Sequence, residues 1–343
     1  MSDEELPEGE VVRRVAFDIG SNATKCQVAD VCDGILVTTV YEEEVPCSFG
    51  VDFKQSQDGR LSDKMQDRGL QVLNMLCKTA VEKGATRSAA IATEVFRKAA
   101  NGEDYLKRIK AEIGLDVSII TQQLEGRLGY LSTVGLSGLP RASLVSWDCG
   151  GASFQVCREP LSPSKAGVED SLLFFLAPIG VSIATSMCVE QIKHLSFATT
   201  PTPNPVSGEQ ADALCVHIQG LLPPTPEWLR GCDSVVAIGG SNSMFCLATE
   251  ILAELDGGAP PAAFTPAQVR RCLEHVVDRS DGQLLAAYCK RDLSDPPSFV
   301  VPKMALLYAV MDACKLPKVA FQRAIGSCAG ILVSDELYAA ASP

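Results

Sequence analysis

Apolar and β-branched residues dominate the first part of the chain. They form three runs that predict strands over Val11–Phe17, Cys26–Val31 and Ile35–Val45. Asp33 and Gly34 separate the last two runs, and this pair is typical of a tight hairpin turn. We therefore expect a meander of antiparallel strands near the start of the chain.

From residue 62 onward, helical spacing of apolar positions alternates with short continuous apolar runs. One predicted helix carries its apolar face on Met65, Leu73, Leu76, Cys77 and Ala80. The pattern predicts helices at about 62–83, 103–113 and 124–134, and buried strands at 88–93 and 117–120. This alternation is typical of an α/β domain.

The strand pattern restarts at Ser143. Strands are predicted at 143–147, 153–157 and 172–176, followed by helices at about 180–195, 207–221, 241–255, 266–277 and 300–315. The Pro-rich stretches at 199–205, 223–226 and 259–266 are expected to be loops. A chain of 343 residues is long for one domain, since single domains usually have roughly 100–200 residues. We expect one domain over 11–130 plus 322–343, a second over 131–321, and an interdomain cleft.

Composition narrows the classes of ligand. Apolar residues make up 46% of the chain, enough for two cores, and the formal net charge is −12. Binding to long nucleic acids depends on Lys and Arg that neutralise phosphates, so an acidic chain argues against that partner. A small phosphorylated ligand stays compatible, because backbone N–H groups can bind it.

The cysteines and the most apolar stretch bear on the cellular compartment of the protein. None of the 14 Cys forms a C-x-x-C pair, so the common zinc spacing is absent, and scattered thiols are typical of a reducing compartment. The stretch Leu172–Ala184 is too short for a membrane span and is interrupted by Pro178 and Gly180. The acidic N-terminal segment has no apolar core of a signal peptide. We expect a cytoplasmic protein without a membrane partner.

Three glycine turns follow apolar strands and carry the candidate chemistry. They are Phe17–Lys25, Asp148–Ser153 and Ala237–Ser243, and the two aspartates that open the first two turns lie about 130 residues apart. Small residues let backbone N–H groups approach an anion, and a helix start after the turn adds to this attraction. A single such turn could be an ordinary hairpin turn, but three in one chain favour a phosphate site.

Four segments, in this order along the chain, resemble motifs of the Ppx/GppA family: Ala16–Asn22, Ala92–Ala99, Ile119–Leu128 and Asp148–Ser153. The family patterns are Asp-x-Gly-Ser-Asn, Ala-Thr-x-x-x-Arg-x-Ala, Ile-Ile-Ser-Gly-x-Glu-Glu-Ala-Arg-Leu and Asp-x-Gly-Gly-Gly-Ser. Weaker matches occur at Pro178–Gly180, at the turn of Gly239 and Gly240, and at Gly326–Leu332. The resemblance covers about 15–335.

The resemblance implies a fold of two duplicated actin-like (ribonuclease H-like) domains and a hydrolase activity. The family comprises exopolyphosphatases and guanosine-pentaphosphate phosphohydrolases, which release terminal phosphate from inorganic polyphosphate or the nucleotide. The resemblance places the general base at Glu125 and a phosphate-binding guanidinium at Arg97. It also leaves a homodimer open, because dimers are common in the family.

The remaining site residues follow from the same resemblance. Asp148 and Asp18 are expected to hold Mg²⁺, the implied cofactor. The phosphate-binding residues are expected to be Ser21, Asn22, Gly150, Gly151, Ser153, Gly239 and Gly240. Catalysis would then rest on positioning and charge stabilisation, as in other phosphoryl transfer.

Two departures from the family keep other functions open. Leu124 stands where the family often has the first of two acids, and Gln155 stands where it usually has a second metal-associated acid. These changes favour a non-catalytic phosphate or nucleotide sensor of the same fold. A sugar or carboxylate kinase of the superfamily is a weaker alternative, since it shares the twin Asp-x-Gly turns but not the segments of Arg97 and Glu125. The sequence leaves open the choice between polyphosphate and guanosine pentaphosphate.

Overall fold

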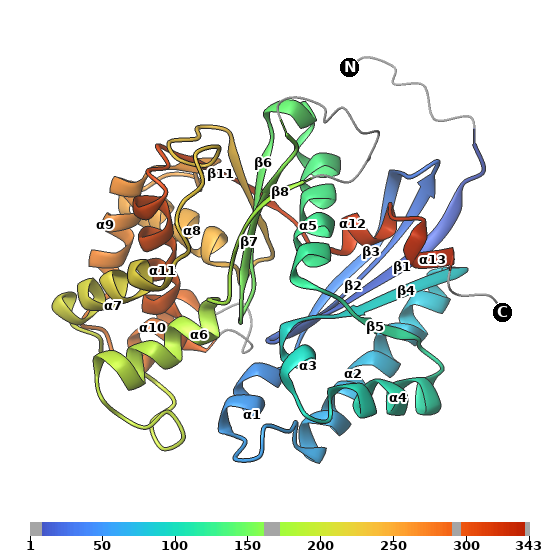
Figure 1. The fold of residues 1–343 in the computed structure, drawn as a ribbon, viewed down its shortest axis with the longest axis horizontal. Coiled ribbons are helices and arrows are strands. Elements are labelled where there is room, and N and C mark those ends of the chain that lie inside the picture. Colours follow the sequence, from blue (N-terminus) through green and yellow to red (C-terminus); the bar gives the residue numbers. More distant parts are fainter. Residues whose placement is uncertain (1–8, 161–171, 290–295, 340–343) are drawn as a thin grey trace. The chain divides into compact units, whose positions relative to one another are not determined.

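A computed structural model describes residues 9–160, 172–289 and 296–339 of the chain. The chain divides into two compact units (Figure 1). Unit 1 comprises Met1–Gly138 and Ala324–Pro343, and unit 2 comprises Leu139–Arg323. The C-terminal segment therefore returns to the unit in which the chain begins.

Unit 1 is built on a five-stranded sheet of order β3-β2-β1-β4-β5. The strands are β1 (Val12–Ile19), β2 (Ala23–Cys32), β3 (Ile35–Pro46), β4 (Arg87–Ala92) and β5 (Val117–Ile119). The first three form the predicted antiparallel meander, whereas β1, β4 and β5 run parallel. Asp33 and Gly34 make the predicted turn with φ of 49° and 72°.

The helices of unit 1 cover both faces of this sheet (Figure 1). They are α1 (Phe49–Gln55), α2 (Asp63–Glu82), α3 (Glu94–Lys98), α4 (Gly102–Ile113), α5 (Gln122–Ser137), α12 (Cys328–Leu332) and α13 (Glu336–Ala339). Side chains alternate along β1, so Phe17 packs with the cluster that contains Leu73 of α2, while Ala16 packs with Leu128 of α5 and Ile331 of α12. The predicted helices α2, α4 and α5 are confirmed; α1 and α3 were not predicted.

Unit 2 repeats this plan with a six-stranded sheet of order β10-β11-β9-β6-β7-β8. Its strands are β6 (Val145–Cys149), β7 (Phe154–Arg158), β8 (Leu173–Ala177), β9 (Val235–Gly239), β10 (Ala263–Phe264) and β11 (Val319–Arg323). As in unit 1, an antiparallel meander, here β6–β7–β8, is extended by parallel strands, here β9 and β11. The prediction of a duplicated α/β fold is confirmed. The prediction that 259–266 is entirely a loop is wrong, because Ala263–Phe264 pairs with β11.

The helices of unit 2 gather around α11 (Val300–Ala313), which is buried along nearly its whole length. The others are α6 (Val181–Met187), which continues into the π-helical turn η2 (Cys188–Ile192), and α7 (Gly208–Leu221), α8 (Met244–Asp256), α9 (Pro266–Val276) and α10 (Asp281–Tyr288). Short 3₁₀ turns lie at η1 (Arg141–Ser143) and η3 (Pro297–Phe299). Thr265 and Gln268 form the predicted cap of α9, with Pro266 at the first helical position.

Parallel strands bring the functional segments of each unit to one edge of its sheet. In unit 1, β1, β4 and β5 end side by side, and the backbone N–H of Thr93 donates to the carbonyl of Ile19 at 3.2 Å. In the same way, the N–H of Ile120 donates to the carbonyl of Ala92 at 3.1 Å. The first glycine turn, the start of α3 and the start of α5 therefore lie at this edge.

Two further features bear on the environment of the chain. Within 9–160, 172–289 and 296–339, no helix has both the length and the apolar character that crossing a bilayer requires. All 14 cysteines fall within these ranges, and each is a free thiol, most of them buried. Free, buried thiols are the state that the sequence predicted.

Candidate active site

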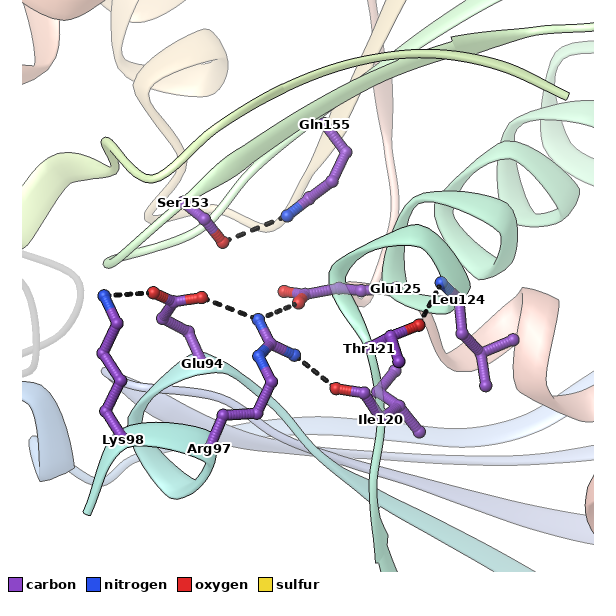
Figure 2. Close-up of polar contacts among 9 residues, drawn as sticks. All are labelled: Glu94, Arg97, Lys98, Ile120, Thr121, Leu124, Glu125, Ser153 and Gln155. Carbon is purple, nitrogen blue, oxygen red and sulfur yellow. Dashed lines mark hydrogen bonds and ion pairs between the residues drawn. The ribbon is translucent and has the colours of Figure 1, made fainter. Parts of the chain in front are cut away.

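Arg97 lies at the centre of a polar network in unit 1 (Figure 2). Its Nη2 donates to Oε2 of Glu125 at 2.9 Å and to Oε2 of Glu94 at 2.8 Å. Its Nη1 donates to the backbone carbonyl of Ile120 at 2.5 Å. The two residues that the resemblance picks out as catalytic, 28 positions apart, are thus brought into direct contact by the neighbouring strands β4 and β5.

Glu125 lies in the first turn of α5, as predicted. The Thr121 hydroxyl caps this helix by accepting from the N–H of Leu124 at 3.2 Å, and the N–H of Glu125 donates to the carbonyl of Thr121. Only 12% of the Glu125 side chain is exposed. A helix start favours negative charge, so the location supports an ionised carboxylate.

Glu94 is a member of the network that sequence reasoning missed. It opens α3, and its side chain is 9% exposed. Its second oxygen, Oε1, forms an ion pair with Nζ of Lys98, one turn along the helix (Figure 2). Burial alone raises the pKa of Glu94, but its bonds to Lys98 and Arg97 outweigh burial and hold the pKa below its ordinary value.

The ion pairs of this network also shift the pKa of Arg97. Burial lowers the pKa of its guanidinium, while the charges of Glu125 and Glu94 raise it, and the net pKa is raised. Because an Arg is charged at any physiological pH, the network holds a fixed positive charge between two carboxylates.

The first glycine turn places Asp18 and Lys25 together. Asp18 is buried near the end of β1, and its Oδ2 accepts from the N–H of Ser327 at 3.1 Å and lies 3.8 Å from Nζ of Lys25. Gly326, with φ of 50°, permits this approach, since a Cβ there would lie within 3.0 Å of both side chains. The carboxylate of Asp18 therefore holds the C-terminal turn of unit 1.

Ser21 and Asn22 follow in the same turn. The backbone carbonyl of Ser21 accepts from the N–H of Gly50 at 2.7 Å, and that of Asn22 accepts from the N–H of Cys47 at 2.9 Å. These bonds fix the turn against the start of α1. The two residues are thereby held at the edge where β1 ends.

The second glycine turn joins β6 to β7 in unit 2. Asp148 is half-buried near the end of β6, and the N–H of Gly150 donates to the carbonyl of Ser153 at 2.9 Å to close the turn. The carbonyl of Gly151 accepts from the N–H of Ser182 at 2.7 Å, which ties the turn to α6. The Ser153 hydroxyl accepts from Nε2 of Gln155 at 3.0 Å (Figure 2).

The turn predicted at Asp148–Ser153 begins later than expected, after Cys149. The pairing of β6 with β7 extends through Cys149 and Phe154, so Cys149 is the last residue of a strand. Burial raises the pKa of its thiol, the charge of Asp148 raises it further, and the charge of Lys303 lowers it. A thiol with a raised pKa is a poor nucleophile near neutral pH, which favours a structural Cys149.

The third glycine turn follows β9, which lies next to β6. The carbonyl of Gly240 accepts from the N–H of Ser243 at 3.1 Å, and the Ser243 hydroxyl caps α8. A Cβ at Gly239 would lie within 3.0 Å of the Ser243 side chain, so the close turn requires glycine there.

A buried lysine supports this turn and was missed in the sequence. Lys303 of α11 is only 2% exposed, and its Nζ donates to the carbonyl of Asn242 at 2.7 Å. Its charge also acts on Cys149, as does that of Asp148. The second and third turns, on adjacent strands, thus share one positively charged side chain.

Asp18 and Asp148 are the two residues that the resemblance assigns to Mg²⁺. Mg²⁺ usually takes one or two carboxylates together with waters and phosphate oxygens. Within the described residues, no group of three or more His, Cys, Asp or Glu side chains could hold a metal ion. Asp18 is buried and faces the ammonium group of Lys25, and Asp148 is partly exposed near the end of β6.

The two units have sheets of matching strand order, and glycine turns follow strands in both. This arrangement is that of two actin-like domains. The sequence model of the Ppx/GppA phosphatase family matches residues 27–159, a range that contains Arg97, Glu125 and Asp148. The resemblance to this family is thereby confirmed.

Individual relatives agree with the family match. Exopolyphosphatase 1 of Mycobacterium bovis is 26% identical over 145 residues, which are 42% of this chain and 42% of the relative. The match therefore spans less than half the length of the curated relatives. A Ppx/GppA family member from Aquifex aeolicus has a TM-score of 0.70 at 21% identity, covering 97% of this chain and 100% of that one. An exopolyphosphatase from Cytophaga hutchinsonii has a TM-score of 0.74 at 16% identity, covering 94% and 97%. At these identities the solved structures establish the fold.

Proposed function

We propose that this protein is a phosphohydrolase that releases terminal phosphate from inorganic polyphosphate or guanosine pentaphosphate. The observation that carries the proposal is the pair of Glu125 and Arg97, joined at 2.9 Å where β4 and β5 end. Relatives named exopolyphosphatase support the choice of polyphosphate as a substrate class.

In this proposal Glu125 is the general base. Its carboxylate takes a proton from a water molecule, and the resulting hydroxide-like oxygen attacks the terminal phosphorus while the bond to the bridging oxygen breaks. Arg97 holds the Glu125 carboxylate in one orientation and contributes positive charge for the phosphoryl oxygens. The cap at Thr121 keeps Glu125 at the helix start, where negative charge is favoured.

Unit 2 has glycine turns of its own that suit a phosphate ligand. Backbone N–H groups of the turns at Gly151 and Gly240, and the Ser153 hydroxyl, suit phosphate oxygens, while the N–H of Gly150 closes its own turn. Asp148 is the residue that we propose to hold Mg²⁺, which when bound would neutralise charge on the substrate phosphates. The buried ammonium group of Lys303 stabilises the third turn by donating a hydrogen bond to the carbonyl of Asn242.

One contact favours the alternative of a non-catalytic sensor. The amide of Gln155 bonds the Ser153 hydroxyl, whereas an acid at this position would add a charged ligand for the metal. A protein that binds phosphorylated ligands without turning them over would fit a site with reduced metal affinity.

Phosphate release from polyphosphate and guanosine pentaphosphate, measured with and without Mg²⁺, tests the proposal. Arg97→Ala should weaken both ligand binding and turnover. Arg108→Ala is a matched control, because Arg108 also pairs with two carboxylates, Asp67 and Glu112, but on the surface of α4. Binding without phosphate release would favour the sensor. The absence of both binding and release, for both compounds, would refute the proposal.

A further inference from the structure

Glu94 is more closely engaged with Arg97 than a surface acid would be. Its side chain is 9% exposed, and its two oxygens bind two different cations, Arg97 and Lys98. Figure 2 shows Glu94 and Glu125 directed at the same guanidinium from two helices, α3 and α5. Neither composition nor the family pattern assigns this residue a role.

The contacts define a charge balance. Nη2 of Arg97 donates to one oxygen of Glu94 and to one oxygen of Glu125, each within 2.9 Å. With Lys98 the group contains two positive and two negative charges and is formally neutral. Without Glu94 the same group would carry one net positive charge.

We propose that Glu94 is a specificity-determining positioning residue, which competes with the terminal phosphate of the ligand for Arg97. This inference rests on the proposed function and deepens it. An incoming anion must displace the Glu94 carboxylate from Nη2, or share the guanidinium with it, and Glu94 can then remain paired with Lys98. A phosphate group with more than one negative charge can displace the Glu94 carboxylate from Arg97, whereas a singly charged anion cannot.

The chemistry of the group supports such competition. A guanidinium binds carboxylates and phosphates through the same donors, so the two are direct competitors for Arg97. Bonds to Lys98 and Arg97 hold the pKa of Glu94 below its ordinary value, so the competing carboxylate is charged at neutral pH. Lys98 is half exposed and can follow the displaced carboxylate.

The test measures binding of pyrophosphate and of orthophosphate by calorimetry. Glu94→Gln keeps the size of the side chain and removes its charge, and should tighten pyrophosphate binding about tenfold, the effect of one screened unit charge a few ångströms away. Glu112→Gln is the matched control, because Glu112 also pairs with an Arg one turn away on a helix, and it should leave binding unchanged. In an active enzyme, KM should fall in Glu94→Gln while kcat does not rise.

Two further variants separate charge from packing. Glu94→Asp keeps the charge and should bind pyrophosphate much as the wild type does. In Glu94→Gln combined with Arg97→Ala the gain should vanish, because the two residues act on one another. If Glu94→Gln does not fold, Glu94→Ser removes the same charge and carries the same expectation.

The outcomes distinguish this inference from the proposed function. Pyrophosphate binding needs no turnover, so tighter binding by Glu94→Gln supports the inference even if no phosphate is released. A folded Glu94→Gln that binds pyrophosphate no more tightly than the wild type would overturn it. Tighter binding by Glu94→Asp to the same extent as by Glu94→Gln would also overturn it, because charge would then not be the cause.

Discussion

Gly180 offers a sharp test of how the second glycine turn is held. It precedes α6, and its φ of −120° and ψ of −172° are open to any residue. A Cβ at this position would nevertheless lie within 3.0 Å of backbone atoms of Gly150, Gly151 and Ala152. Gly180→Ala therefore introduces a steric clash with the turn without straining its own backbone.

The expected magnitude follows from two opposing effects. Overpacking against backbone costs typically ~1–3 kcal/mol of unfolding free energy. Replacing glycine by alanine recovers about 0.4–1 kcal/mol through the unfolded state. We expect a net destabilisation of about 1–2 kcal/mol. If the turn instead shifts by about 1 Å, turnover should fall by up to roughly 10²-fold, because phosphate positioning is lost.

Urea unfolding followed by tryptophan fluorescence measures the net destabilisation. The chain has two Trp, Trp147 and Trp228, and both belong to unit 2, so the signal reports the unit that contains the mutation. Gly208→Ala is the control, since Gly208 begins α7 with no atom within 4 Å of a new Cβ. It should be neutral or slightly stabilising. Wild-type stability and turnover in Gly180→Ala would refute the reasoning.

Two further predictions concern the second glycine turn. Gln155→Glu should lower the Mg²⁺ concentration needed for half-maximal phosphate release, because it adds a carboxylate beside Ser153; no shift, or a shift upward, would count against a metal role there. Cys149→Ser should change turnover only modestly, since its raised pKa disfavours a thiolate; complete loss of turnover with intact ligand binding would show that the thiol is a nucleophile.

Local patterns were sufficient to predict much of the fold. The apolar face of α2 and the cap at Thr265 depend on residues close together in the sequence, and both appear in the structure. Strand β11 was missed because Val319–Arg323 is short and is held by pairing with β9, some 80 residues earlier in the chain. The two-residue strand β10 exists only through its pairing with β11.

The candidate site was predictable where a segment resembled a family motif. Arg97 and Glu125 were both expected, although only the adjacency of β4 and β5 shows that they touch. Glu94 and Lys303 were not expected, because acidic and basic residues on helices are usually exposed. Lys303 bonds a partner distant in sequence, the carbonyl of Asn242, and Glu94 pairs with two cations of its own helix, Arg97 and Lys98.

The most direct test of the central claim is the effect of Glu125→Gln on phosphate release, measured alongside ligand binding. The amide keeps the shape of the side chain but removes the base, so turnover should fall by about 10²–10⁴-fold. Binding of pyrophosphate should survive or tighten, because one repelling charge is gone. A Glu125→Gln protein that releases phosphate at the wild-type rate would contradict the assignment of Glu125 as the general base.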